Sequence, residues 1–249
     1  MSNVLISAKG LVKRFGAIYA ARDITVDIHE KTVTGLIGTN GAGKTTFVNM
    51  ITGYLQPDEG EILYQGKSVV GLTSREITHL GVARSFQIPQ LFITHSALEN
   101  VEIALGVAKQ PLSRAMAVLE QFGLQRFAHL EAGTLPEGVR KLLDIALAMV
   151  AEPKVLLLDE PTSGVASDEK FEVMERVMEV IRSQGVTALF VEHDMEIISR
   201  YSDVVLAFYD GTILSQGSVE TVLNNDKVLE YIIGEPTTKA EEAVRAIEH

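Results

Sequence analysis

The chain has 249 residues, of which 46% are hydrophobic and 22% charged, and it contains no cysteine. This is the composition of an ordinary globular protein, and the lack of cysteine excludes disulfides and thiolate metal sites. The net charge of -11 argues against a nucleic-acid partner, because binding to a phosphate backbone depends on clustered Lys and Arg. A chain without cysteine fits a reducing compartment, so we expect a cytoplasmic protein.

Three further observations concern membranes. The N-terminal segment lacks a basic stretch followed by a long apolar one, so we expect no secretory signal. The longest apolar runs fall far short of the ~20 residues that a transmembrane helix needs. The acidic balance also disfavours docking on anionic lipid. If the protein works at a membrane, we expect another protein to hold it there.

The first part of the chain combines β-like runs with a Gly-rich loop and one helix. Its expected elements are strands over 4–8, 24–28, 32–37, 61–64 and 82–87 and a helix over 44–52. Residues 88–151 then show a helical pattern and are expected to form a helical lobe. The helices expected within this lobe cover 96–109, 112–122 and 139–151.

Strands and helices alternate after the helical lobe. Strands are expected over 154–159, 187–192 and 204–209, with helices over 168–184 and 195–201. This alternation predicts a covered, mostly parallel sheet and an α/β fold. Residues 237–249 are polar and lack an apolar face, so we expect a loosely attached tail.

The sharpest motif fits the phosphate-binding loop pattern G-x-x-x-x-G-K-[ST]. Its glycines let the backbone bend so that successive N–H groups face a phosphate, and the following helix adds its positive end. Lys44 is expected to contact the β- and γ-phosphates, and Thr45 to offer its hydroxyl to Mg2+. The alternative is a Gly-rich turn that merely precedes a helix, but the expected strand and helix are the context that the motif requires. The predicted ATP site comprises Gly38, Thr39, Asn40, Gly41, Ala42, Gly43, Lys44, Thr45 and Thr46.

A second motif, Leu156-Leu157-Leu158-Asp159-Glu160, ends a strand that is expected to be buried on both faces. Ligands of open α/β sheets gather at the carboxyl ends of the strands. Asp159 is therefore expected to hold Mg2+ through water, and Glu160 to polarise the water that attacks the γ-phosphate. The alternative is a charged cap where a strand leaves the core, which the phosphate loop upstream disfavours.

With both motifs present, the chain resembles the nucleotide-binding domains of ABC transporters over nearly its whole length. The resemblance implies a P-loop NTPase fold of ABC type, with a mostly parallel sheet core, an N-terminal antiparallel β part and a helical subdomain. It also implies an ATP hydrolase that uses ATP and Mg2+ and forms a single nucleotide-binding domain over residues 1–236.

The resemblance assigns roles to three residues outside the two motifs. Phe15 matches an aromatic residue that stacks on adenine, and ordinary packing is its alternative role. Gln87 matches a glutamine that links the γ-phosphate and the metal to the helical lobe, although a lone Gln is usually solvated surface. His193 matches a histidine that contacts the γ-phosphate, although most lone histidines are structural.

The segment around Gln87 is most similar to the branched-chain amino-acid importer branch of the family. The runs that carry this similarity are Ile88-Pro89-Gln90-Leu91-Phe92 and Leu98-Glu99-Asn100-Val101. The resemblance implies membrane-spanning permease subunits, a separate substrate-binding protein and a place on the inner face of the cell membrane. A lipopolysaccharide-export ATPase shares several of these features and is one alternative.

The chain departs from the family at its signature L-S-G-G-Q, which in the family reaches across a dimer to the partner's γ-phosphate. The corresponding residues here are Leu135, Pro136, Glu137, Gly138 and Val139. Pro136 has no hydroxyl to donate, and Glu137 at ~5 Å would oppose phosphate binding by roughly 3 kcal/mol at an effective dielectric near ~20. We therefore expect Glu137 to point away from the phosphate, or the completed site to be weak.

Further expectations concern the surroundings of the signature. Thr134, Pro136 and Glu137 are expected to form a capping box at the start of the next helix. Ala166 stands where the family usually has an Asp that touches the partner across the dimer. These departures predict an asymmetric pair, in which this chain supplies the phosphate loop and Glu160 while a second, different ATPase subunit supplies the better signature. A homodimer is the alternative.

The leading hypothesis is an ATPase subunit that powers an ABC importer, with permease subunits docked on the helical lobe. A soluble ABC ATPase of iron–sulfur cluster assembly is an alternative from another class. A regulatory module that binds nucleotide and barely hydrolyses it is a third, against which Glu160 and His193 argue.

Overall fold

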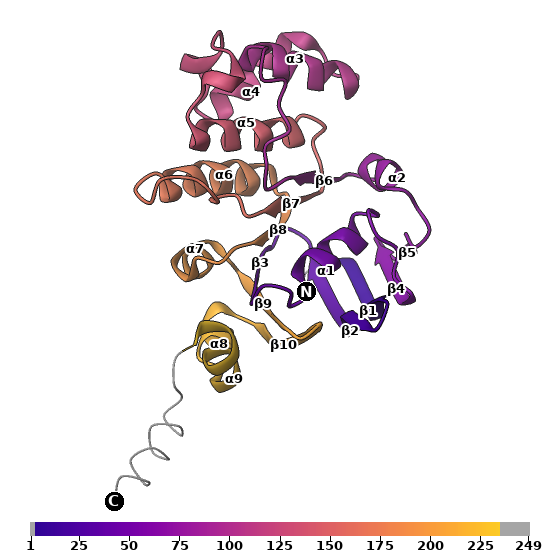
Figure 1. Cartoon of the computed structure of the whole chain (residues 1–249). Helices are drawn as coiled ribbons and strands as arrows, with labels where there is room; N and C mark the ends of the chain where they lie inside the picture. Colours follow the sequence, from indigo (N-terminus) through magenta and orange to yellow (C-terminus); the bar gives the residue numbers. More distant parts are fainter. Residues whose placement is uncertain (1–2, 235–249) are drawn as a thin grey trace, which may run out of the picture.

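The computed structural model describes residues 3–234, so the predicted tail over 237–249 lies outside the described residues. Two sheets form the body of the molecule (Figure 1). Beyond the second sheet lies a helical lobe whose helices are α3 (Ala97–Val107), α4 (Ala115–Gln121) and α5 (Glu137–Met149).

The first sheet is antiparallel and comes from the N-terminal part of the chain. Its strands are β1 (Val4–Phe15), β2 (Ile18–His29), β4 (Glu59–Tyr64) and β5 (Lys67–Ser68), in the order β2-β1-β4-β5. The pairing of β1 with β2 contains several register shifts, and Gly10 within β1 has a φ of 61°. Such irregularities interrupt the alternation of apolar residues. The sequence pattern indicated only 4–8 and 24–28 of two strands that are each 12 residues long.

The second sheet carries the candidate site. Its strands are β3 (Val33–Gly38), β6 (Val82–Ser85), β7 (Val155–Asp159), β8 (Thr187–Val191), β9 (Val204–Tyr209) and β10 (Thr212–Gly217). They lie in the order β10-β9-β3-β8-β7-β6, and every neighbouring pair is parallel except β9 with β10. The predicted mostly parallel sheet is thus confirmed. Strand β10 was not predicted, because its residues are nearly all half-buried and show no alternation.

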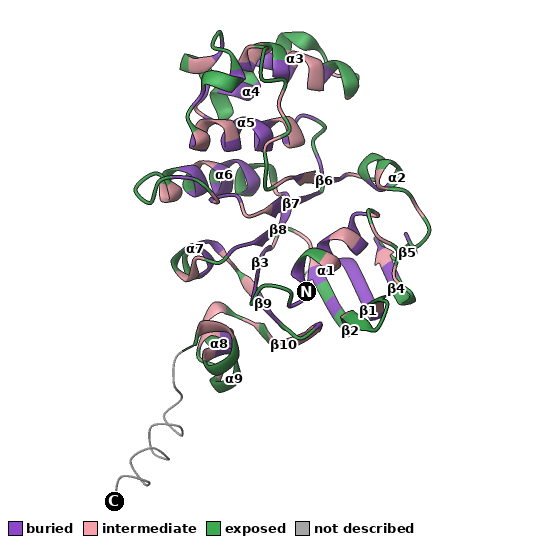
Figure 2. Cartoon of the chain, viewed as in Figure 1, coloured by how far each residue is buried: buried purple, intermediate pink, exposed green. Residues whose placement is uncertain are grey.

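This sheet is buried on both faces (Figure 2). On β7, Leu156 and Leu158 belong to a core shared with the helical lobe, whereas Val155 and Leu157 belong to a core shared with the antiparallel sheet. Adjacent side chains of a strand point to opposite faces, which explains this division. Helices α6 (Lys170–Gln184) and α7 (Met195–Tyr201) cover the first face, and α1 (Lys44–Ile51) covers the second.

The helical lobe agrees with its predicted helices to within a few residues, except that Leu112–Arg114 forms a 3-10 turn before α4. Helix α3 begins with a capping box, in which Ser96 Oγ accepts from Glu99 N at 3.2 Å and Glu99 Oε2 accepts from Ser96 N at 2.7 Å. The capping box predicted for α5 is wrong. Thr134 Oγ1 donates to the Glu131 carbonyl at 2.8 Å, and the N-cap is Pro136, whose side chain has no acceptor.

The remaining elements are short, and the sequence pattern did not predict them. They are α2 (Ser74–His79), α8 (Val219–Leu223), α9 (Asp226–Val228), 3-10 turns over Gln125–Phe127 and Ala132–Thr134, and a π-helical turn over Leu229–Ile233. Within residues 3–234, no helix combines the length and apolar character required to cross a membrane.

Candidate functional site

The predicted site residues meet because of the strand order β3-β8-β7-β6. The Gly-rich loop follows β3, His193 follows β8, Asp159 ends β7, and Gln87 follows β6. These strands are parallel, so their carboxyl ends lie along one edge of the sheet. Segments that are far apart in the sequence therefore converge there.

Close packing requires two glycines of the loop. A Cβ on Gly38 would lie 2.3 Å from the Phe208 carbonyl oxygen, and one on Gly43 would lie 2.6 Å from the Ala20 carbonyl oxygen. Both residues also have positive φ, at 149° and 105°, where an L side chain is strained. The loop is thus seated between β9 and β2 in a conformation that only glycine allows at these positions.

Lys44 begins α1, and only 6% of the residue is exposed. Its Nζ donates to the Gly38 carbonyl at 2.6 Å and to the Thr39 carbonyl at 3.1 Å. Burial lowers the pKa of Lys44, and the charges of Glu160 and Asp159 oppose this shift. The ammonium group is therefore held within the loop and within electrostatic range of both acids.

The rest of the loop presents a mixed surface. Thr39, Asn40 and Thr45 are exposed, Thr46 is half-buried, and Ala42 is buried. Thr45 and Thr46 lie in the first turn of α1, where backbone N–H groups have no partner within the helix and favour an anion. The loop can therefore offer amides, hydroxyls and an ammonium group to a polyphosphate.

Asp159 forms an ion pair that the sequence did not reveal. Its Oδ2 accepts from Arg84 at 2.6 Å, and the other terminal nitrogen of Arg84 donates to Asn49 Oδ1 at 2.6 Å. The Arg84 guanidinium also lies 5.6 Å from the ring centroid of Tyr54 and 5.0 Å from that of Phe86. Arg84 thus joins the end of β7 to the helix that follows the phosphate-binding loop.

The structure brings three of the predicted residues together at Glu160. Gln87 Nε2 donates to Glu160 Oε2 at 2.7 Å, and His193 Nε2 lies 3.3 Å from Glu160 Oε1. The carboxylate can only accept, so this bond requires the tautomer of His193 that carries its proton on Nε2. Both carboxylate oxygens are therefore oriented, as a group that accepts a proton from water requires. Glu160 also has a φ of 48°, a left-handed backbone conformation that is uncommon outside glycine.

A buried acid, Glu192, lies behind His193 and was also missed. Its Oε1 accepts from Thr162 N at 3.0 Å and Thr162 Oγ1 at 2.6 Å, and its Oε2 accepts from His193 N at 3.1 Å. Glu192 therefore links the loop after Glu160 to the residue that carries the imidazole. An acid beside His193 at the end of an apolar strand was the signal available in the sequence.

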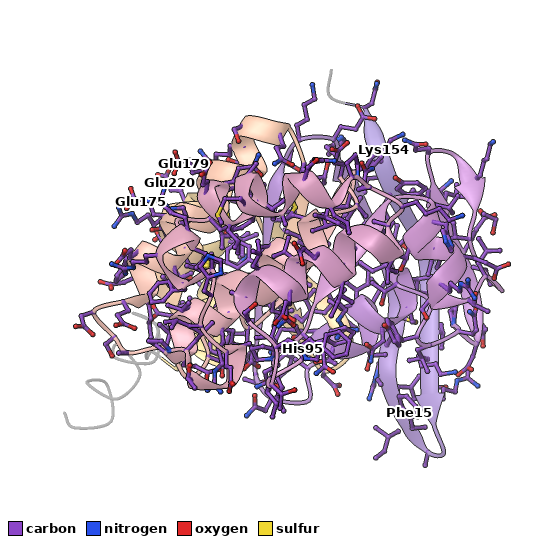
Figure 3. All side chains as sticks on the ribbon, turned by 90° about the horizontal axis from the view of Figure 1, so that it is seen from above. Phe15, His95, Lys154, Glu175, Glu179 and Glu220 are labelled. Atoms are coloured by element: carbon purple, nitrogen blue, oxygen red, sulfur yellow. The ribbon has the colours of Figure 1, made fainter. Side chains whose placement is uncertain are left out.

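Phe15 lies apart from this cluster. It ends β1 near the turn of the β1–β2 hairpin and is 52% exposed (Figure 3). Lys13 Nζ lies 5.9 Å from the centroid of its ring. Strand β2 passes beside the phosphate-binding loop at Ala20, two residues after Ile18, the residue that pairs with Phe15. The open face of the aromatic ring is available for stacking.

The degenerate signature lies at the start of α5. Leu135 is buried in the lobe core, and a Cβ on Gly138 would lie 3.3 Å from Val173 Cγ2. Glu137 forms an ion pair with Arg140, and its Cγ lies near Gly164 in the loop after Glu160. The negative charge of Glu137 is thus partly compensated within the helix. Val139 is half-buried at the edge of a cavity between α5 and α6.

In the described part of the chain, no group of three or more His, Cys, Asp and Glu side chains is arranged to hold a metal ion. Magnesium does not need such a group, because it is usually held by one or two carboxylates together with substrate phosphates and water. The exposed Thr45 hydroxyl, the Asp159 carboxylate and the Gln87 amide oxygen are ligands of this hard type. The donor set therefore fits Mg2+.

Comparison with known proteins identifies the family. Residues 21–163 match the family described as "ABC transporter". The chain belongs to this ATP-binding family. It is 35% identical over 254 residues to the high-affinity branched-chain amino acid transport ATP-binding protein LivG of Escherichia coli (strain K12), with 94% of this chain and 100% of the relative covered.

Solved structures of ABC cassettes agree with this assignment. The ADP conformation of MJ1267, an ATP-binding cassette of an ABC transporter, superposes with a TM-score of 0.85 at 29% identity, covering 94% of this chain and 100% of that one. The dimeric structure of MJ0796, a bacterial ABC transporter cassette, gives a TM-score of 0.77 at 26% identity, covering 86% and 99%. The predicted P-loop NTPase fold of ABC type and ATP binding are thereby confirmed. Because LivG is a branched-chain amino acid transport ATP-binding protein, this relative favours the importer ATPase over the lipopolysaccharide-export and iron–sulfur alternatives.

Proposed function

We propose that this ABC ATPase powers an importer of branched-chain or related amino acids. The observation that carries the proposal is the Glu160 carboxylate, which is engaged by Gln87 on one oxygen and by His193 on the other, beside the Lys44 loop. The substrate class rests on the similarity to LivG, a branched-chain amino acid transport ATP-binding protein whose whole length this chain matches. Cargo selection itself belongs to a separate binding protein and to permease subunits.

Nucleotide binding is assigned to two regions. Phe15 stacks on adenine, and the residues from Gly38 to Thr46 surround the phosphates with backbone amides and the Lys44 ammonium group. Thr45, Gln87 and Asp159 contribute oxygen ligands for Mg2+, directly or through water. The bound ion neutralises charge on the β- and γ-phosphates.

Hydrolysis is assigned to Glu160 and His193. Glu160 accepts a proton from the attacking water, and its two hydrogen-bond partners hold its carboxylate in one orientation. His193 contacts the γ-phosphate from the neighbouring strand. Lys44 stabilises the negative charge that develops on the phosphate oxygens.

The degenerate signature supports an asymmetric assembly. Glu137 and Pro136 replace the residues that in the family face the partner's phosphate, so this chain supplies one good phosphate loop and one poor signature. We expect a second ATPase subunit with the better signature. The dimeric structure of the MJ0796 cassette supports pairing of two cassettes, and the unlike partner is inferred from the signature of this chain. Permease subunits then hold the pair at the inner face of the cell membrane.

Lys44→Ala tests nucleotide binding. Because this change removes the ammonium group from the loop, Mg-ATP should bind at least tenfold more weakly, a loss of ~1.4 kcal/mol. Binding is measured by equilibrium titration with a fluorescent ATP analogue. Equal affinities in both proteins, or no binding by the unaltered chain, would contradict the proposal.

Glu160→Gln separates hydrolysis from binding. The amide cannot act as a base, so turnover should fall by about 10²-fold or more while ATP binding persists.

Turnover of the unaltered protein is measured for this chain alone, for its partner ATPase alone and for the mixture. Robust hydrolysis by this chain as a homodimer would remove the argument for asymmetry.

A further inference from the structure

Lys141 is a buried cation on α5 whose role the proposed function does not explain. Only 2% of the residue is exposed. Its Nζ donates to the Gln87 carbonyl and, at 3.3 Å, to the Glu160 carbonyl. In the described part of the chain, its hydrogen-bond partners are thus two backbone carbonyls, and it forms no ion pair. Burial lowers the pKa of Lys141, and the charges of Glu137 and three further acids oppose this shift without an ion-pair contact. A buried ammonium group without a paired carboxylate is costly, which indicates a local requirement for its two hydrogen bonds.

The two carbonyls belong to residues that are already joined by their side chains. Gln87 Nε2 donates to Glu160 Oε2 at 2.7 Å. Lys141 therefore completes a ring of interactions. The side chains of Gln87 and Glu160 bond directly, and their backbone carbonyls are bridged by the Lys141 ammonium group. The ring fixes Gln87 relative to Glu160 at both side chain and backbone.

The backbone of Glu160 needs such support. Its φ of 48° lies in the left-handed region, which costs a residue with a side chain roughly 1–3 kcal/mol unless its surroundings hold it there. Its carbonyl accepts from Ser163 N at 3.1 Å as well as from Lys141. Lys141 thus supplies one of the two recorded bonds that hold this carbonyl in its strained orientation.

A second buried charge on the same helix holds the same segment. Asp144, one turn after Lys141, is 6% exposed. Its Oδ1 accepts from Gln90 N at 2.8 Å and its Oδ2 from Phe86 N at 3.4 Å. Residues 86–90 are therefore attached to α5 at several points. These bonds connect α5, whose first turn carries part of the degenerate signature, to the segment that contains Gln87.

We propose that Lys141 is a positioning residue for hydrolysis. It holds Gln87 and Glu160 in fixed positions relative to each other and links both to α5. This inference rests on the proposed function, because it acts through the residues assigned to the γ-phosphate and the water. Lys141 lies behind these residues and bonds their backbone, so it affects the reaction by placement and not by contact with ATP.

The test compares Lys141→Met with Leu143→Ala, using the unaltered ATPase pair as reference. Methionine keeps an unbranched side chain but cannot donate, whereas Leu143→Ala weakens the core of the same helix and leaves both carbonyl bonds in place. A 1 Å misplacement costs about 10² in rate, so Lys141→Met should lower kcat by about that factor. The dissociation constant for Mg-ATP should change less than about threefold, since the phosphate-binding loop is untouched. Leu143→Ala should lower the unfolding midpoint without this loss of kcat.

Two further measurements separate positioning from general damage. In a Gln87→Ala background, Lys141→Met should lower kcat much less than it does alone, because the two residues act as one unit. Amide hydrogen exchange of residues 86–90 should accelerate in Lys141→Met and stay unchanged in Leu143→Ala. Unaltered exchange together with unaltered kcat in Lys141→Met would overturn the inference, as would an equal loss of kcat in Leu143→Ala. Failure of the unaltered chain to bind Mg-ATP would instead overturn the proposed function.

Discussion

Arg84 and Asp159 form a nearly buried ion pair at 2.6 Å, with exposed side-chain fractions of 9% and 14%. The same guanidinium binds Asn49 on α1, so the pair fixes the distance between β7 and the helix of the phosphate-binding loop. Loss of one member of such a pair leaves the other charge buried and uncompensated.

Arg84→Met should lower the free energy of unfolding by about 3 kcal/mol, because Asp159 is left as an unpaired buried carboxylate. Denaturant titration measures the loss. Arg114→Met is the matched control, since Arg114 pairs with Glu152 at the same 2.6 Å but with exposed fractions of 37% and 60%. An exposed pair of this kind contributes about 0–1 kcal/mol. Equal losses in the two variants would show that burial does not set the strength of the Arg84 pair.

Gly43→Ala should damage the loop more than Gly66→Ala. Both glycines have positive φ, at 105° and 76°, so each variant carries a strain of ~1 kcal/mol. Only the Cβ on Gly43 meets a backbone atom, 2.6 Å away, whereas nothing lies within 4 Å of the one on Gly66. We expect Gly43→Ala alone to weaken Mg-ATP binding, in a titration with a fluorescent analogue. Similar binding by both variants would argue against the close packing of the loop on Ala20.

The free energy of unfolding should depend on pH in the alkaline range because of Lys44. Burial lowers the pKa of Lys44 from 10.5, so the folded state disfavours its protonated form. Between the lowered pKa and 10.5 the unfolded state binds more protons, and the contribution of Lys44 to stability therefore rises with pH. Lys44→Met has no group that titrates here. As pH rises toward 10.5, the free energy of unfolding of the unaltered chain should therefore increase relative to that of the variant. If the free energies of unfolding of the two proteins, measured by denaturant titration, changed equally with pH, the lowered pKa of Lys44 would be contradicted.

Glu192→Ala should disturb the placement of His193. Three donors lose their acceptor, two from Thr162 and one from His193 N, and an unsatisfied buried group costs ~1–3 kcal/mol. We expect a loss of about that size in denaturant titration, together with a lower kcat for ATP hydrolysis. Glu192→Gln keeps one oxygen acceptor and should show a smaller loss. Equal losses with Gln and with Ala would contradict this prediction and would indicate that Glu192 acts through its negative charge, which both variants lack.

The phosphate-binding loop and the acidic strand end could be predicted because both are local. Gly38 and Gly43 precede a helix, and Asp159 ends an apolar run, so neither requires knowledge of distant residues. The mostly parallel character of the sheet could be predicted, but the order of its strands could not. Strand β10 pairs by backbone bonds that leave little trace in its side chains, and β1 continues past its bulges where the apolar pattern stops.

The supporting residues were missed for the opposite reason. Arg84 is separated from Asp159 by 75 positions and Lys141 from Gln87 by 54. Their sequence neighbourhoods resemble ordinary strand and helix, and only the packed fold reveals what they bond. The capping box predicted at Thr134 failed for a local reason, because the short turn that ends at Thr134 directs its hydroxyl to the Glu131 carbonyl.

Lys44 has a thermodynamic consequence beyond its charge. Its ammonium group donates to the Gly38 and Thr39 carbonyls, so folding has already restricted a side chain that carries ~2 kcal/mol of rotamer entropy. A polyphosphate that accepts these donors meets a side chain already immobilised, and little of its affinity is lost to ordering. When a polyphosphate binds, Lys44 Nζ exchanges carbonyl acceptors for phosphate oxygens, and the side chain does not first have to adopt an ordered conformation.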